Sequence, residues 1–170
     1  PIVHAALDRD GGRMAILREG AVQVRASGSG ELLYELPSSG GRRVAFIPGS
    51  AGLLLVEHED RALRAVLPPG AAGSERVDAL LVALDSAGVK RVVDMDAKGG
   101  WLAFGLLSGE VVVVHADDPS DVRVHAGEAG QSHLVRLFGG DGRVVSAVQG
   151  VATRVLGPEV GRVRPIAGKG

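Results

Sequence analysis

The sequence repeats one pattern four times, and this repetition constrains its fold more than any other feature. Each copy has a turn rich in Gly and Asp, a short apolar segment and a second turn. The copies read DRDGGRMAI, PGSAGLLLV, DAKGGWLAF and GGDGRVVSA, anchored at Gly12, Gly52, Gly100 and Gly142. The anchors lie roughly 40–48 residues apart, which is the repeat length of four-stranded propeller blades. A fixed period of this length predicts stacked copies of one supersecondary unit.

The stretches before three of the anchors also align with one another without gaps. They run from Glu31, Ala79 and Asp121 to the next anchor glycine, and each reads as strand, small-residue turn, strand. One unit is therefore four strands joined by turns. A four-stranded sheet has two faces and cannot bury both alone, whereas radial stacking of such sheets buries them.

We therefore predict an all-β chain of four four-stranded antiparallel sheets, arranged as beta-propeller blades. The whole chain, residues 1–170, is one domain, either a propeller or a half-propeller. The four units span about 2–37, 42–85, 90–127 and 132–168.

The second unit carries extra residues, and its last element has two interpretations. The extra residues, Leu67 to Val77, contain two prolines and two glycines and predict an irregular loop. The following LLVAL, residues 80–84, is predicted as the fourth strand because it aligns with Glu31–Leu36. The alternative is an amphipathic helix capped by Ser74, because Val77, Leu80, Leu81 and Leu84 have helical spacing.

Composition narrows the function classes. The net charge is −1 and Cys is absent, so we expect no nucleic-acid footprint, disulfide or thiolate site. No apolar run approaches the ~18 residues of a membrane span, and we expect no membrane partner. PIVHAALDRD lacks the features of a signal peptide and an initiator Met. We therefore expect a cytoplasmic protein that is processed or is a piece of a longer chain.

The units resemble WD-repeat propeller blades, most clearly in GELLYELPSSGGRRVAFIPGSAGLLLVEHEDRALRAV. This segment has Gly-Glu, a strand, a small turn, a second strand, a Gly turn, a third strand, an acidic turn and a fourth strand. The likeness covers Ile2 to about Gly168 and is to degenerate, bacterial-type repeats. The Trp-Asp pair and the Gly-His dipeptide of the family are absent from all four units. The family's structural His–Ser/Thr–Asp–Trp hydrogen-bond set therefore transfers to no residue here.

Propellers have roughly four to eight blades, and units of about 40 residues are typical of the larger rings. Four units are then half of a ring, with an apolar blade face exposed at each end, and such faces usually mark interfaces. A second copy completes an eight-bladed ring, or another chain or further sequence supplies the remaining blades. The third alternative is a small ring of four blades closed on itself.

The sequence predicts no catalytic site, no metal site and no cofactor. The histidines lack the i, i+4 pairing of a zinc site. Between His115 and His125, the acidic residues Asp117, Asp118 and Asp121 read as a solvated turn, with a loop cation site as the alternative. We expect the single tryptophan, Trp101, to pack in the core or between blades, with stacking on a ligand as the alternative.

The resemblance implies a non-catalytic protein-interaction scaffold or sensor, with a protein partner or further blades of the same ring. In WD-like propellers the fourth-to-first and second-to-third strand loops share one rim that often binds partners. The predicted partner-binding rim here contains Arg18, Glu19, Arg42, Arg43, Glu57, His58, Asp60 and Arg61.

The alternative function is a propeller enzyme or ligand-binding domain with a site at the central channel. That site needs matching polar residues from successive blades. The equivalent positions Asp8, Pro48, Asp96 and Phe138 do not repeat.

Overall fold

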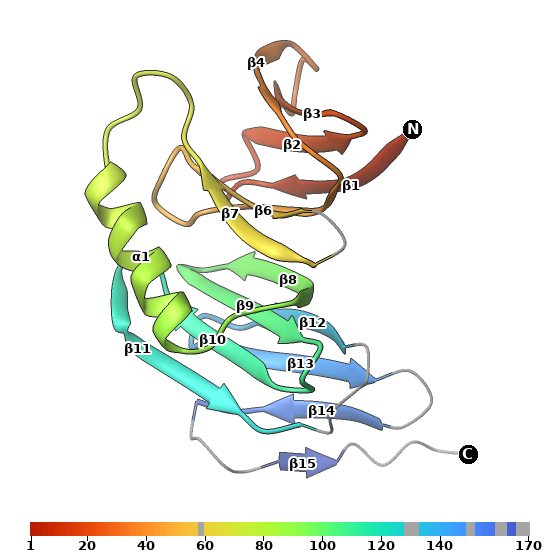
Figure 1. Cartoon of the computed structure of the whole chain (residues 1–170), viewed down its shortest axis with the longest axis vertical. Coiled ribbons are helices and arrows are strands. Elements are labelled where there is room, and N and C mark those ends of the chain that lie inside the picture. The colour runs from red at the N-terminus through yellow and green to blue at the C-terminus, as the bar shows by residue number, and fades with distance from the viewer. Residues whose placement is uncertain (58–59, 128–132, 149–151, 159–162, 166–170) are drawn as a thin grey trace.

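In the computed structural model, the described residues (1–57, 60–127, 133–148, 152–158 and 163–165) form four antiparallel sheets and a helix (Figure 1). We number the sheets as blades in chain order. Blade 1 contains β1 (Ile2–Leu7), β2 (Arg13–Arg18), β3 (Ala21–Ala26) and β4 (Leu32–Pro37). Blade 2 contains β5 (Gly41–Phe46), β6 (Leu53–Glu57) and β7 (Ala62–Val66), and is followed by α1 (Ser74–Ser86). Blade 3 contains β8 (Val92–Lys98), β9 (Trp101–Leu106), β10 (Val111–His115) and β11 (Asp118–His125). Blade 4 contains β12 (His133–Phe138), β13 (Arg143–Val148), β14 (Ala152–Leu156) and β15 (Val163–Pro165).

Within each blade, consecutive strands pair with their neighbours, as in a meander. Tight turns join the strands, and two of them show why glycine is needed. Gly20, between β2 and β3, has φ 82°, and Gly109, between β9 and β10, has φ 96°. Side chains with a Cβ rarely adopt this backbone conformation. The glycine-rich spacing of the repeat therefore places the strand ends.

Three apolar layers hold the blades together. Blades 1 and 2 pack through Leu17, Val24 and Leu55, which are fully buried. Blades 3 and 4 pack through a layer that includes Trp101 and Val135. The largest layer lies between blades 2 and 3 and also contains buried residues of α1. Aliphatic side chains supply most of this burial, and burial of apolar surface is the main stabilising term in folding.

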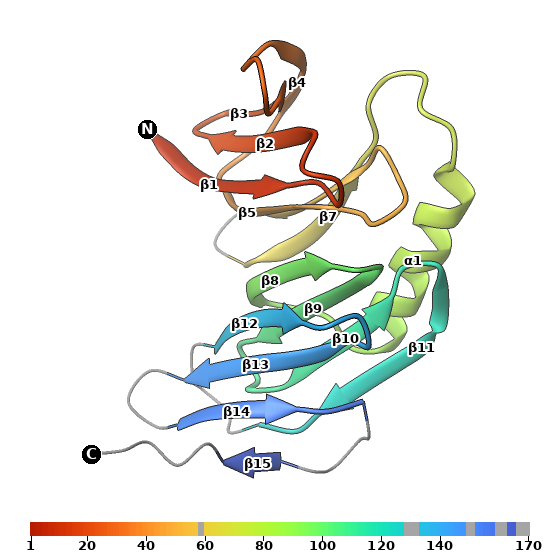
Figure 2. The ribbon, with the colours of Figure 1, turned by 180° about the vertical axis from the view of Figure 1, so that it is seen from behind.

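The first strands of the blades, β1, β5, β8 and β12, lie side by side along one side of the molecule (Figure 2). Blade 1 and blade 4 lie at opposite ends, with blades 2 and 3 between them (Figures 1 and 2). The four blades therefore form part of a ring, as predicted. The alternative of four blades closed on themselves is wrong, because the first and last sheets do not meet.

The predicted fourth strand of blade 2, residues 80–84, is wrong: this segment belongs to α1. Leu80 and Leu84 are 1% and 2% exposed, whereas Val82 between them is 67% exposed. A strand would place these three side chains on one face, whereas a helix separates Val82 from the other two. The segment contains good helix formers and no Gly or Pro. Its helical apolar stripe packs on the layer between blades 2 and 3, and this packing outweighs the alignment with Glu31–Leu36.

The alternative interpretation of this segment, a helix, is confirmed, but the predicted cap at Ser74 is wrong. Gly73 is the N-cap residue, with φ 96°, and no side-chain cap hydrogen bond is formed.

Candidate interaction surface

A buried carboxylate joins the first strands of three blades. Asp94, on β8 of blade 3, is 2% exposed. It accepts hydrogen bonds from Arg43 Nε of β5 at 2.9 Å and from an Arg136 guanidinium nitrogen of β12 at 2.6 Å. It also accepts one from the backbone N–H of Val135 at 3.1 Å. A buried carboxylate needs such partners, and here they come from both adjacent blades.

Two further side chains extend this connection along the first strands. Asp96 accepts a hydrogen bond from the backbone N–H of Leu137 at 2.8 Å, again from blade 3 to blade 4. His4 Nδ1 of blade 1 accepts one from the N–H of Val44 in blade 2 at 3.3 Å. Burial lowers the pKa of His4, and the positive charge of Arg43 lowers it further. His4 is therefore held neutral, as an acceptor at Nδ1 must be.

A cavity of about 330 Å³ lies beside these strands, on the side where a propeller has its channel. Its lining includes His4, Met95, Asp96 and Arg136. The carboxylate of Asp96 hydrogen-bonds to backbone N–H groups of Leu137 and Ala97, and Arg136 binds Asp94. These polar groups therefore serve to join blades.

The sequence comparison of Asp8, Pro48, Asp96 and Phe138 missed this network. Asp94 and Arg136 occupy equivalent positions two residues earlier, and opposite charges there were the available signal.

The predicted rim residues come from loops that the structure brings together. Arg18 and Glu19 are exposed at the end of β2, and the N–H of Ser38 donates to the carbonyl of neighbouring Gly20 at 3.0 Å. Ser38 Oγ in turn donates to Glu57 at the end of β6, at 3.1 Å. The loop between blades 1 and 2 therefore contacts the second-to-third strand loops of both blades.

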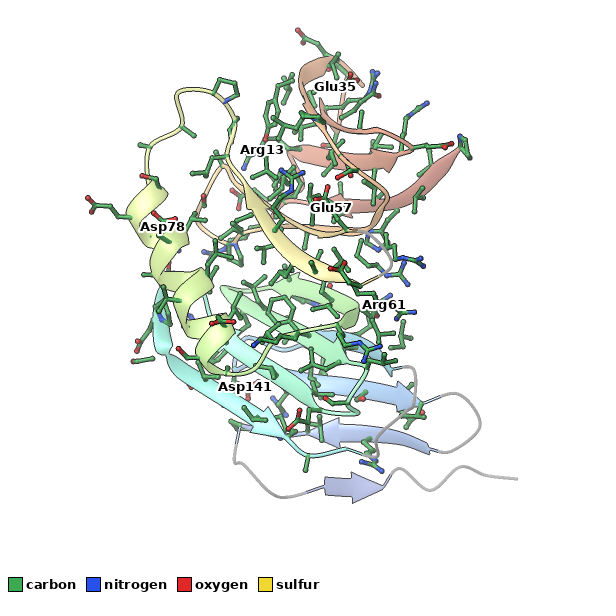
Figure 3. All side chains as sticks on the ribbon, viewed as in Figure 1. Arg13, Glu35, Glu57, Arg61, Asp78 and Asp141 are labelled. Carbon is green, nitrogen blue, oxygen red and sulfur yellow. The ribbon has the colours of Figure 1, made fainter. Side chains whose placement is uncertain are left out.

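Two of the rim residues make internal contacts. Glu57 (Figure 3) is 3% exposed and binds Arg64 through two hydrogen bonds of 2.6 and 2.9 Å. The Arg64 guanidinium lowers the pKa of Glu57, against the effect of burial, and Ser38 and the N–H of Ser39 lower it further. Arg43 binds Asp94, as described above. Through these contacts with other protein groups, Glu57 and Arg43 help to position the loops of the rim.

The other rim residues are more accessible, with one outside the described chain. Arg42 and Asp60 are exposed, and Arg61 is half-buried at the loop end of β7 (Figure 3). His58 lies outside the described residues.

Sequence reasoning missed Lys90 and Arg91, which are exposed on the same rim just before β8. They belong to the connection from blade 2 to blade 3. Treating this connection as a loop that leads into the first strand of the next blade would have identified them.

Of the acidic residues that follow His115, Asp117 lies in the turn between β10 and β11, whereas Asp118 and Asp121 lie in β11, so the predicted turn is wrong for these two. The carboxylates of all three bind protein groups. Asp117 pairs with Arg76 of α1, Asp118 accepts the N–H of Ser120, and Asp121 pairs with Arg123 at 3.1 Å. No cluster of three or more metal-ligating side chains occurs among the residues that the structure describes.

Trp101 packs between blades 3 and 4, as predicted. It is 6% exposed, and its indole N–H donates to the carbonyl of Gly140 at 3.2 Å. The Arg123 guanidinium carbon lies 4.2 Å from the ring centre.

The helix α1 has 13 residues, fewer than the roughly 20 that a bilayer crossing requires.

Comparison with known proteins identifies the fold. No protein-family model matches the sequence, and no curated protein matches it. Among solved structures, the beta-propeller domain of Myceliophteria thermophila Cps50 (Swd1) is similar over 96% of this chain and 56% of its own, with 12% identity and a TM-score of 0.59. U3-55K is similar over 96% of this chain and 48% of its own, with 15% identity and a TM-score of 0.56. The computationally designed Ika8 protein is similar over 95% and 47%, with 13% identity and a TM-score of 0.59.

This chain thus spans about half the length of the structures that it matches. The likeness agrees with the radial order of the four sheets and with the exposed sheet at each end. The chain therefore has the beta-propeller fold, and its four blades form part of a ring.

Proposed function

We propose that this chain is a non-catalytic protein-interaction module. Its blades, WD-repeat-like and of the degenerate bacterial type, join further blades in a ring, and a protein partner binds at the rim. A chain without cysteine needs no oxidising compartment for disulfides, and we place the module in the cytoplasm. The main support is the exposed aliphatic side chains on the two open blade faces.

The first open face belongs to blade 1. Ala6 of β1 packs on the layer shared with blade 2, and His4 bonds to Val44. Because strand side chains alternate, Val3 and Leu7 point the other way, and they are 46% and 60% exposed.

The second open face belongs to blade 4. Val135 and Leu137 of β12 pack against blade 3, and Leu134 on the opposite face is 48% exposed. Closed interfaces elsewhere in the molecule bury equivalent aliphatic side chains completely. The two open faces therefore suit contact with other blades, and both alternatives, a second copy and further sequence, fit them.

The alternative of a channel-side enzyme has weaker support. Asp94, Asp96 and Arg136 form hydrogen bonds between blades. A catalytic acid or base must instead be free to exchange a proton with substrate.

Sedimentation of the purified chain, with Leu7→Asp and Leu134→Asp variants, tests the proposal. We expect the wild type to form a species of at least twice 17.4 kDa, or a monomer that binds a hydrophobic dye. Each Asp substitution should abolish that assembly or most of the dye binding. Val82→Asp is the matched control, because Val82 is exposed on α1 and lies on neither open face. A stable 17.4 kDa monomer that binds no dye and is unaffected by both substitutions would overturn the proposal.

A further inference from the structure

Blade 2 lacks the fourth strand that the other three blades have. Blades 1, 3 and 4 each have four strands, whereas blade 2 has three in the order β5-β6-β7. The chain then runs through α1 to β8, and within the described residues β7 pairs with β6 alone. Unpaired N–H and C=O groups along an outer strand are a template for another strand. The position of a fourth strand is therefore open at β7 (Figure 1).

A groove of about 510 Å³ lies beside the N-terminal end of this edge. β7 lines one side with Ala62 and Leu63, and the C-terminal half of α1 and the residues after it line the other with Leu81, Leu84 and Val89. Leu63 and Ala65 of β7 pack toward α1 and the layer between blades 2 and 3. Alternate side chains of a strand added to β7 would point to the same side, toward the aliphatic side chains of this groove.

Two arginines at the loop end of the groove are available to a ligand, because the other charged residues there have partners within the protein. Of the four charged residues lining it, Lys90 and Asp85 pair at 3.7 Å, and Asp60 accepts the N–H of Ala62 at 3.3 Å. Arg91, the fourth, and adjacent Arg61 form no ion pair with any residue that the structure describes. Their positive charge is available to an acidic ligand.

The backbone holds these two arginines at the same end of the groove. Arg61 and Arg91 have φ 57° and 54°, a left-handed conformation that is uncommon for residues other than glycine. The N–H of Val92 donates to the carbonyl of Arg61 at 3.1 Å. The N–H of Leu107 donates to the carbonyl of Arg91, also at 3.1 Å. These bonds link the loops of blades 2 and 3, and residues in such conformations cluster at binding sites.

We infer that β7, the groove and the two arginines bind an extended peptide segment of a partner protein. The segment adds to blade 2 as its fourth strand, with aliphatic side chains in the groove and acidic residues at Arg61 and Arg91. All described strand pairs in the molecule are antiparallel, and Arg61 directly precedes the first residue of β7. The acidic residues therefore lie at the C-terminal end of the segment. Strand addition of this kind takes its affinity from the backbone and its specificity from alternate side chains. This inference rests on the proposed interaction function and gives it a ligand class.

The test uses three synthetic peptides, acetylated and amidated. SVTVTVDE has the inferred pattern, SVTVTVKK reverses the charge of its end, and EDVTVTVS reverses the direction. We expect SVTVTVDE to bind at least tenfold more tightly than either of the others in a fluorescence titration. Hydrogen exchange should show new protection of the β7 amides in the complex.

The variant Arg61→Asn with Arg91→Asn removes both charges, and Asn tolerates the left-handed backbone. We expect this variant to lose the preference for SVTVTVDE over SVTVTVKK. Arg9→Asn is the matched control, because Arg9 is exposed in the turn between β1 and β2, away from β7. Failure of SVTVTVDE to bind at 1 mM, equal binding by the double variant, or protection of another element instead of β7 would overturn the inference. The sedimentation result for the open faces is independent of these outcomes, so failure here leaves the proposed function standing.

Discussion

The carboxylate of Asp94 accepts a 2.6 Å hydrogen bond from the guanidinium of Arg136, joining the first strand of blade 3 to that of blade 4. Arg43 approaches the same carboxylate from blade 2. One buried acid thus connects three blades. This polar contact fixes how the first strands align, because hydrogen bonds are directional, whereas apolar packing is not.

Replacement of Asp94 by Ala should destabilise the chain by about 1–3 kcal/mol, because the buried N–H of Val135 loses its acceptor. The two arginines are 34% and 50% exposed and can be hydrated instead. Urea unfolding measures the change. Asp78→Asn, an exposed site on α1, is the control, with an expected change within about 0.5 kcal/mol. Equal stability of the two variants would contradict the role of Asp94.

The stability of the chain should fall as the pH drops below about 6.5, the ordinary pKa of histidine. Burial lowers the pKa of His4 and of His125, and Arg43 and Arg123, respectively, lower it further. The unfolded chain therefore takes up protons at a higher pH than the folded chain. The stability that these two histidines contribute is complete above pH 6.5, and it is lost as the pH falls through the folded pKa of each histidine.

Each histidine contributes a slope of at most about 1.4 kcal/mol per pH unit in this window. Urea unfolding between pH 8 and pH 5 measures the slope, and His4→Gln should reduce it. The lowered pKa of Glu57 acts only in more acidic solution. An unfolding free energy that stays constant from pH 7.5 to 5.5 would refute the prediction.

Gly142→Ala should destabilise the contact between blades 3 and 4 by about 2–4 kcal/mol. Gly142 has φ +75°, and a Cβ there would lie 2.7 Å from the Trp101 ring. Gly140→Ala is the matched control, because a Cβ at Gly140 meets nothing within 4 Å. Fluorescence of Trp101, the only tryptophan, reports unfolding directly. Similar unfolding midpoints for the two variants would show that the contact is not tight.

Leu84→Ala should cost about 2–5 kcal/mol, the usual range for a buried leucine, because Leu84 is 2% exposed in the layer between blades 2 and 3. Val82→Ala, 67% exposed two residues earlier, should change the stability by less than about 0.5 kcal/mol. Thermal unfolding followed by circular dichroism measures both. If Val82→Ala proved as damaging as Leu84→Ala, the side-chain pattern would be that of a strand.

The sequence was sufficient to predict the strands of blade 1 and the stacking of repeats. Turns such as the one at Gly20 depend on local backbone conformation, and strand alternation has a period of two, so both are readable within a few residues. The same local reasoning failed at Leu80–Leu84, where strand and helix patterns fit equally well. There the decision came from packing against blade 3, whose residues follow later in the chain.

The candidate site also has a part that the sequence predicts and a part that only the fold shows. The expectation that second-to-third and fourth-to-first strand loops share one rim predicted Asp60 and Arg61 there from the sequence alone. It did not show that Glu57 is buried against Arg64 or that Asp94 binds Arg43 and Arg136, which are 51 and 42 residues away in the chain. Whether a charged side chain binds a partner inside the protein or remains free depends on which distant groups the fold brings within hydrogen-bond distance. The repeat and its turns thus determined the architecture, whereas tertiary contacts decided which strand edge stays open and which arginines remain free beside it.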